Sequence, residues 1–196
     1  MENPPPLILG STSRYRQELL QRLRLPFTVV SPQVDETPMP GESPSDLAMR
    51  LALQKADAVS SLHPQAVVIG ADQVADLDGE ALGKPGDHAR ASAQLRLMSG
   101  REVVFQTAVA VVHRRSGFQR VALAPVRVRF RALSDLEIER YLTLDQPYDC
   151  AGSAKVETLG IALLASVDSD DPTALVGLPL IRLCEMLRPV GLDPLA

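Results

Sequence analysis

The stretch LILGSTSRYR, residues 7–16, decides which fold class we expect for this chain. Its first three residues form a short apolar run that stops at Gly10, which predicts a β-strand. The hydroxyl-bearing residues from Ser11 to Ser13 are of the kind that cap a helix N-terminus, and leucines then recur at helical spacing within 14–23. A strand that passes through a short polar turn into a helix is typical of α/β domains, so we expect that class.

The rest of the chain repeats this alternation and adds a hairpin-like middle section. Strands are predicted at 27–30, 66–69, 102–112, 126–131 and 161–167, and helices at 45–62, 87–99, 134–142 and 179–187. This mixture of orders predicts a mixed central sheet flanked by helices. Because no repeat or low-complexity linker interrupts the chain, we expect residues 1–196 to form a single domain.

Composition and charge argue against several classes of protein. With 45% apolar and 22% charged residues the chain is globular, and its formal net charge of −4 argues against a nucleic-acid binder. The N-terminus lacks the basic and apolar regions of a signal peptide, and no stretch resembles a membrane span. Cys150 and Cys184 form no metal or redox motif, and Cys184 lies in an apolar helical row that predicts a core position. A cytoplasmic location is therefore expected.

The turn after the first strand is a candidate anion site. A helix N-terminus presents free N–H groups and the positive end of a dipole. Ser11 and Ser13 would add hydroxyl donors, and Arg14 and Arg16 would add positive charge. The alternative is a capped surface helix with two solvated arginines. Because the pattern is not a GxxxxGK[ST] phosphate loop, the residues alone leave both interpretations open.

One lysine lies where an apolar side chain is expected. On a helical wheel over 45–62, Lys55 falls near the middle of a broad apolar face. Arg50, Gln54 and Asp57 fall on the opposite side. Such a lysine either extends its ammonium group to the surface or reaches an anion, and both alternatives stay open.

Acidic residues after two predicted strands are candidates for catalysis or metal binding. Asp72 follows the buried apolar run at 66–69, at the strand end where open α/β sheets bind ligands. Asp35 and Glu36 follow another strand. Carboxylates that converge there would hold a hard divalent ion or activate water, whereas ordinary loop and turn acids are the alternative.

The remaining candidates are weaker. Lys84 is held in a stiff Gly-Lys-Pro loop, which by itself indicates little. His63, His88 and His113 have no metal-ligand spacing, and we expect all three at the surface.

Seven motifs in one order together resemble the Maf family. They are LILGSTSRYR (7–16), VDE (34–36), LALQKA (51–56), IGADQV (69–74), LGKP (82–85), CAGSAKVE (150–157) and LVGLPL (175–180). The resemblance implies an elongated α/β fold with two lobes around a cleft, similar to inosine-triphosphate pyrophosphatases. It also implies hydrolysis of a nucleoside triphosphate to a monophosphate and pyrophosphate, with a divalent metal cation (Mg, Mn or Co) as cofactor.

The same resemblance gives roles to single residues. Asp72 matches the catalytic proton acceptor of the family. Glu36 and Asp72 would hold the metal, and whether Asp72 acts as base, as metal ligand or as both stays open. The residues that match substrate- and phosphate-binding positions are Ser11, Arg16, Lys55 and Lys84.

Three positions separate branches of the family. Tyr15, Gln73 and Glu157 resemble the branch that acts on 7-methyl-GTP, whereas dTTP and UTP pyrophosphatases carry Arg, Thr and Gln. Because 7-methylguanine is cationic, a carboxylate and an aromatic face both favour it. The alternatives are a dTTP/UTP pyrophosphatase and, outside the enzymes, a nucleotide-sensing regulator of septum formation. Arg14 and Gln17 depart from the family motif and replace a proline and an arginine.

The expected partners follow from these interpretations. The substrate is a nucleoside triphosphate, and neither nucleic acid nor a membrane is expected. A homodimer is left open.

Overall fold

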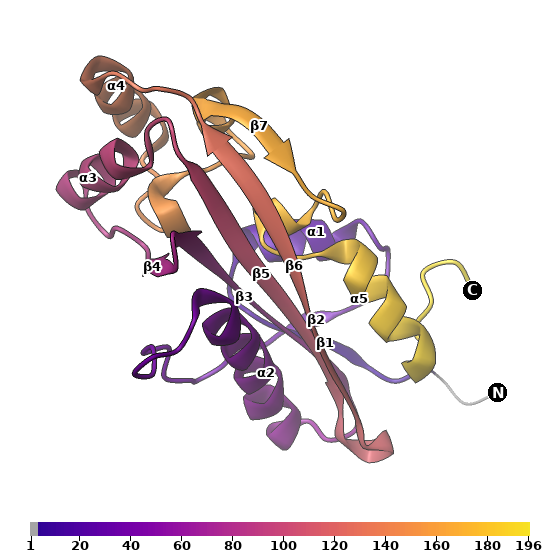
Figure 1. Cartoon of the computed structure of the whole chain (residues 1–196). Coiled ribbons are helices and arrows are strands. Elements are labelled where there is room, and N and C mark those ends of the chain that lie inside the picture. Colours follow the sequence, from indigo (N-terminus) through magenta and orange to yellow (C-terminus); the bar gives the residue numbers. More distant parts are fainter. Residues whose placement is uncertain (1–3) are drawn as a thin grey trace.

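The computed structural model describes residues 4–196, which form an elongated α/β molecule around one long twisted sheet (Figure 1). The regular elements are β1 (Leu7–Gly10), α1 (Arg14–Gln21), β2 (Thr28–Val29), α2 (Pro44–Leu62), β3 (Val67–Leu77), β4 (Glu80–Leu82), α3 (His88–Met98), β5 (Glu102–His113), β6 (Phe118–Phe130), α4 (Asp135–Asp145), β7 (Leu164–Asp168) and α5 (Leu180–Leu187). Short 3₁₀ turns are η1 (Arg114–Ser116), η2 (Ala151–Ser153), η3 (Leu159–Leu163), η4 (Ala174–Val176) and η5 (Arg188–Val190).

The sheet is mixed, as predicted. Its strand order is β2-β1-β3-β5-β6-β7, with β4 paired to β3 off this path. β1 runs parallel to β2 and β3, whereas the β3–β5, β5–β6 and β6–β7 pairs are antiparallel. The α/β class with a mixed central sheet is therefore confirmed.

Alternating strand residues supply two separate cores on the two faces of the sheet at its N-terminal end. α2 covers one face, where Ile8 and Val68 point, and α1 and α5 cover the other, where Leu9 and Ile69 point (Figure 1). A third core lies at the other end of the sheet, where α3 and α4 pack on β5 and β6 around Phe105. We call these two ends the N-terminal lobe (β1, β2, α1, α2, α5) and the distal lobe (β4, β7, α3, α4).

One predicted strand end is wrong. β3 does not stop near Ile69 but continues to Leu77, because the antiparallel partner β5 pairs with it far beyond the parallel section. Asp72 therefore lies inside a strand, opposite Ala108, and not at its carboxyl end. The parallel pairing of β3 with β1 does end at Gly70, so Asp72 still follows the carboxyl end of the parallel part of the sheet.

The strand predicted at 161–167 is also shifted. Residues before Leu164 form the turn η3, and β7 runs from Leu164 to Asp168. η3 contains a tight turn at Gly160, whose N–H donates to the carbonyl of Lys155 at 3.0 Å. A β-carbon at Gly160 would come within 2.5 Å of that carbonyl oxygen, so only glycine allows this tight turn.

Two predictions about single side chains are corrected. His113, the last residue of β5, is buried and not exposed, and its Nδ1 lies 2.9 Å from the hydroxyl oxygen of Ser116. His63 and His88 are exposed as expected. Cys184 is only half-buried, at the edge of the α5 row and not inside the core. Across residues 4–196, no helix combines the length and apolar character that crossing a bilayer requires.

Candidate active site

A cavity of about 610 Å³ lies where the two lobes meet. Its volume is in the range of small-molecule sites, and its openings leave it in contact with solvent. The N-terminal lobe contributes the turn and first helix after β1, and the distal lobe contributes the loops around η2. The site candidates among its lining residues are Ser11, Tyr15, Arg16, Glu36, Lys55, Gln73, Lys84 and Glu157.

Lys55 forms the centre of an ionic cluster at this wall. Its side chain is 7% exposed, and its Nζ lies 2.6 Å from Oδ1 of Asp72 and 2.7 Å from Oε1 of Glu36. The ammonium group therefore reaches anions, and extension to the surface is excluded. Two carboxylates from different parts of the chain converge on this one nitrogen, so the three charges depend on one another.

The approach of α2 to β3 places this cluster. A β-carbon at Gly70 would lie 2.2 Å from the carbonyl oxygen of Ala52 and 2.6 Å from the N–H of Ala56. The helix backbone thus touches the strand at a point that only glycine permits. Lys55 lies between Ala52 and Ala56 on α2, and Asp72 is two residues beyond Gly70, so this close contact brings the two charges together.

Glu36 and Asp72 differ in their contact with solvent. Burial opposes the charge on Glu36, but the surrounding cations, Lys55 first among them, more than offset it and lower the pKa of this carboxyl. Its side chain is 54% exposed, whereas that of Asp72 is 10% exposed. Asp72 does not line the cavity itself but lies directly behind Lys55. Oδ2 of Asp72 accepts no hydrogen bond from the protein. Within residues 4–196 it does not count as a fully buried atom without a partner, so it remains accessible to water.

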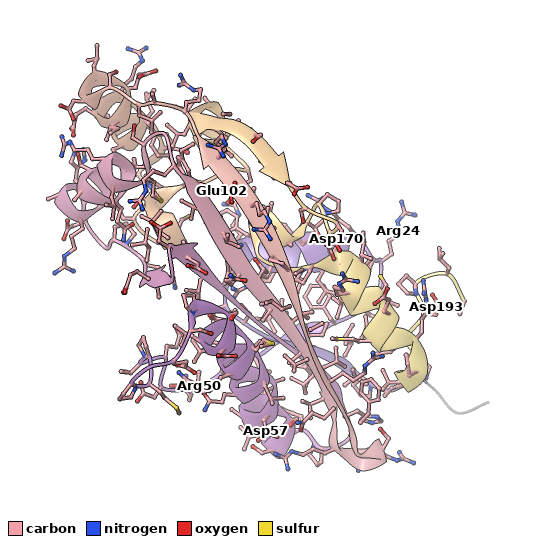
Figure 2. The ribbon with its side chains drawn as sticks, viewed as in Figure 1. Arg24, Arg50, Asp57, Glu102, Asp170 and Asp193 are labelled. Carbon is pink, nitrogen blue, oxygen red and sulfur yellow. The ribbon has the colours of Figure 1, made fainter. Side chains whose placement is uncertain are left out.

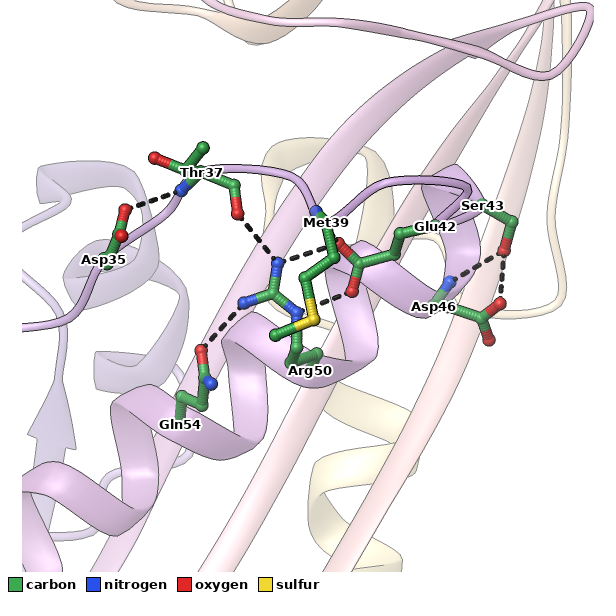
Figure 3. Close-up of polar contacts among 8 residues, drawn as sticks. All are labelled: Asp35, Thr37, Met39, Glu42, Ser43, Asp46, Arg50 and Gln54. Atoms are coloured by element: carbon green, nitrogen blue, oxygen red, sulfur yellow. Dashed lines mark hydrogen bonds and ion pairs between the residues drawn. The ribbon is translucent and has the colours of Figure 1, made fainter.

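An arginine clamp holds the loop that carries Glu36. Nε and Nη2 of Arg50 donate to the two carboxylate oxygens of Glu42 at 2.5 and 2.7 Å, and Nη2 also donates to the carbonyl of Thr37 at 3.1 Å (Figure 3). This bidentate pair and its contact with the Met39 N–H lower the pKa of Glu42 to about 2. Arg50 lies on α2 (Figure 2). The helix that carries Lys55 therefore also holds the loop that brings Glu36 to it.

Arg16 and Ser11 form the part of the wall after β1. Nε of Arg16 donates to the carbonyl of Gly177 at 2.9 Å, and its Nη1 donates to Oγ of Ser11 at 3.3 Å. Burial lowers the pKa of Arg16 below its ordinary value, against the opposing charges of Asp72 and Glu36. Ser13 caps α1 by accepting from the Arg16 N–H at 3.5 Å.

The other predicted cations of this region differ among themselves. Arg14 pairs with Glu18 on the exposed side of α1 at 2.7 Å, so for Arg14 the solvated alternative is closer to the structure. Gln17, the departure from the family motif, donates weakly to the carbonyl of Thr12 at 3.4 Å. Lys84 is exposed at the cavity wall, and Gln94 holds its loop by donating to the carbonyl of Gly83 at 3.0 Å.

Tyr15, Gln73 and Glu157 meet in the same cavity although they come from α1, β3 and the loop after η2. Nζ of Lys155 lies 5.5 Å from the centre of the Tyr15 ring, a cation–π distance. Partial burial and the nearby acids Asp145 and Asp149 raise the pKa of Glu157, while Lys155 acts in the opposite direction. The three residues therefore combine an aromatic face that holds a cation with an amide and a carboxylate.

The ligand set for a divalent cation is small. Among residues 4–196, no three His, Cys, Asp or Glu side chains gather as a metal cluster. Glu36 and Asp72 do converge on one point, and each has an oxygen that Lys55 does not bind. Mg²⁺ is commonly held by one or two carboxylates together with substrate phosphates and water, and this pair fits that pattern.

Residues outside the predicted set also shape the site. Lys155, which contacts the Tyr15 ring, lies outside the predicted set, and its only signal in the sequence is its position two residues before Glu157. Thr107 and Asp171 are buried polar residues. Asp171 accepts from the N–H groups of Ile181 and Arg182 at the start of α5, and nothing in its local sequence indicates this partner.

Comparison with known proteins identifies the family of this chain. The family model described as "Maf-like protein" matches residues 6–190. A relative from a Polaromonas species, called 7-methyl-GTP pyrophosphatase, is 69% identical over 95% of this chain and 85% of its own length. A relative of the same name from Bordetella pertussis is 60% identical over 98% of this chain and 96% of its own length.

A more distant likeness is to the structure of a HAM1 protein from Coxiella burnetii. Its TM-score is 0.45 at 15% identity, over 64% of this chain and 73% of that one. The family model covers almost the whole chain, and the two relatives match at least 95% of it at 60% identity or more. The chain therefore belongs to the Maf family.

Proposed function

We propose that this protein is a nucleoside triphosphate pyrophosphatase that hydrolyses 7-methyl-GTP to 7-methyl-GMP and pyrophosphate. The observation that carries the proposal is one cavity with two chemically different ends. Lys55, which binds Glu36 and Asp72, lines the part that we call the phosphate end, and Tyr15, Gln73 and Glu157 line the part that we call the base end. Relatives at 69% and 60% identity bear the name of this activity.

The reaction exchanges one bond at the α-phosphorus. The oxygen of a water molecule bonds to that phosphorus, the bond to the bridging oxygen of the β-phosphate breaks, and pyrophosphate leaves. Asp72 takes the proton of the water through Oδ2, the oxygen that Lys55 does not bind. Lys55 holds Oδ1 and so keeps the carboxylate oriented while Oδ2 accepts the proton.

Cations of the wall orient the triphosphate. Arg16 and Lys84 both line the cavity, and the free N–H groups at the start of α1 add donors. A divalent cation held by Glu36, Asp72 and phosphate oxygens would supply further neutralisation of the charge that develops on the phosphates. Positioning and electrostatic stabilisation together account for most of the rate in phosphate transfer of this kind.

The base end is suited to a cationic purine. In the free protein the Tyr15 ring already holds a cation, the ammonium group of Lys155. A cationic 7-methylguanine ring would stack on the same face of Tyr15. Glu157 would pair with the positive charge of this ring or with one of its N–H groups. Pyrimidines lack the charge and the donor-rich edge, which argues against the dTTP/UTP alternative.

We place this reaction in the cytoplasm, where nucleoside triphosphates are found. A nucleotide-sensing regulator would bind without turnover, and it would not need Asp72 to contact water.

The experiment is a product analysis in H₂¹⁸O with purified protein, 7-methyl-GTP and Mg²⁺ or Mn²⁺. We expect pyrophosphate and 7-methyl-GMP in equal amounts, with the label in the monophosphate. Release of orthophosphate and a nucleoside diphosphate would contradict the proposed bond cleavage. Tight binding of 7-methyl-GTP without turnover would support the sensor instead.

A further inference from the structure

Gln73 is held by three acceptors on its nitrogen side. Its Nε2 donates to Oγ1 of Thr107 at 2.9 Å and to the carbonyls of Ala174 and Leu175, both at 3.0 Å. Thr107 is its direct partner across the β3–β5 ladder and is fully buried. The two carbonyls come from η4, about a hundred residues further along the chain.

These contacts fix which way the amide points. Backbone carbonyls only accept, so the NH₂ group of Gln73 must face them, and a flipped amide would place oxygen against two carbonyl oxygens. The hydroxyl of Thr107 donates to the Ala174 carbonyl at 3.0 Å, which leaves its lone pairs to accept from Gln73. Thr107 thus completes a closed network around the nitrogen.

The oxygen of this amide remains available to a ligand. Oε1 of Gln73 accepts no hydrogen bond from the protein. It is also not fully buried, because within residues 4–196 the one fully buried side-chain N or O atom without a partner is Nε2 of His113. Oε1 is therefore reached by solvent, and Gln73 lines the cavity. The base end consequently presents two acceptors, this amide oxygen and the carboxylate of Glu157.

We infer that Thr107 is a positioning residue that turns Gln73 into a fixed hydrogen-bond acceptor for the base, so that the site takes 7-methylated purines with a 2-amino group. The inference rests on the proposed function and deepens it. Guanine offers N1–H and the 2-amino group side by side on one edge, which suits two acceptors. Hypoxanthine lacks the 2-amino group, and uracil and thymine present one N–H between two carbonyl acceptors.

The test compares Thr107→Val, which keeps the shape and removes the hydroxyl, with Thr107→Ser, which keeps the hydroxyl. Each protein is assayed with 7-methyl-GTP and with 7-methyl-ITP, which differ only in the 2-amino group. We expect the wild type to prefer 7-methyl-GTP by about tenfold or more in kcat/KM, because a site built to bind a donor rejects the analogue without it. Thr107→Val should reduce this preference several-fold through KM, and Thr107→Ser should retain it.

A second ratio separates positioning from a general loss of structure. The preference for 7-methyl-GTP over GTP depends on the positive charge that N7-methylation gives the ring. Gln73 does not recognise this charge, so Thr107→Val should leave that preference unchanged. If Thr107→Val does not fold, Gln73→Met in the wild-type background should remove the preference for the 2-amino group directly.

The outcomes are distinct. Equal kcat/KM for 7-methyl-GTP and 7-methyl-ITP in the wild type, or a Thr107→Val variant that slows both substrates equally, would overturn the inference and leave the proposed function intact. No turnover of either methylated nucleotide by the wild type would overturn the proposed function as well.

Discussion

The two ends of the cavity are built by different means. At the phosphate end, charged side chains bind one another directly, as Lys55 binds Glu36 and Asp72. At the base end, Gln73 is oriented by backbone carbonyls of a 3₁₀ turn and by a buried hydroxyl. Under the proposed function, charge at the first end would provide rate and geometry at the second would provide substrate specificity, so substitutions at the two ends should change different kinetic constants.

The largest effect is expected at the phosphate end. Asp72→Asn keeps the size of the side chain and removes the charge that accepts a proton, and kcat should fall by about 10²–10⁴-fold. Glu36 remains to pair with Lys55, so the variant should fold. Pyrophosphate release and circular dichroism measure the two effects.

Asp76→Asn is the matched control for this variant, because Asp76 lies on the same strand and accepts from Gln106 outside the cavity. It should keep near wild-type turnover. A folded Asp72→Asn variant that retains turnover within a few-fold of wild type would remove Asp72 from the chemistry.

At the base end, Glu157→Gln should narrow the preference for 7-methyl-GTP over GTP by about tenfold, which corresponds to about 1.4 kcal/mol. The amide keeps hydrogen bonding but no longer attracts the positive ring. kcat should change little. Glu102→Gln, an exposed site on β5 (Figure 2), is the control and should keep the preference. An unchanged ratio in Glu157→Gln would mean that the carboxylate does not reach the base.

Acidification should impair base selection and turnover at different pH values, without any mutation. The pKa of Glu157 is raised by partial burial and neighbouring acids, so its charge is present above that pKa and is lost as the pH falls through it. The pKa of Glu36 is lowered, so this carboxylate stays charged to a more acidic pH. As the pH falls below neutral, the ratio of kcat/KM for 7-methyl-GTP to that for GTP should therefore fall before kcat for GTP does. If kcat for GTP is lost first, the assignment of the two carboxyls is wrong.

The smallest effect concerns the loop that delivers Glu36. Arg50→Ala removes the bidentate contact with Glu42 and the hydrogen bond to Thr37, so the loop should become less ordered and kcat should fall a few-fold. Arg114→Ala is a matched control, because Arg114 pairs with Asp57 elsewhere on α2. Arg114→Ala should leave kcat unchanged and lower the melting temperature only slightly. Equal effects of the two substitutions would show that Arg50 has no special part in the site.

The same contrast between the two ends explains what the sequence could predict. Lys55 stood out because a charge interrupts an apolar helical face, and the structure gives that charge two partners. The mixed sheet followed from the order of strand and helix patterns. The network around Gln73 could not be predicted, because the carbonyls of Ala174 and Leu175 carry no side-chain signal and lie far away in sequence.

Errors in strand ends have a similar cause. Local apolar runs do not show how far an antiparallel partner extends pairing, so β3 was predicted to end before Asp72. Gly160 marks a turn through its contact with the Lys155 backbone, and that contact is visible only in three dimensions.

The most direct test of the account is a single-tube competition between 7-methyl-GTP, GTP, dTTP and UTP, with the kcat/KM ratio for each pair taken from the rates of monophosphate formation. We expect kcat/KM for 7-methyl-GTP to exceed that for each of the other nucleotides by about tenfold or more. The Asp72→Asn variant should hydrolyse no nucleotide at a rate comparable to the wild type. Comparable kcat/KM for 7-methyl-GTP and dTTP in the wild-type protein would contradict the assignment of Tyr15, Gln73 and Glu157 to a cationic purine.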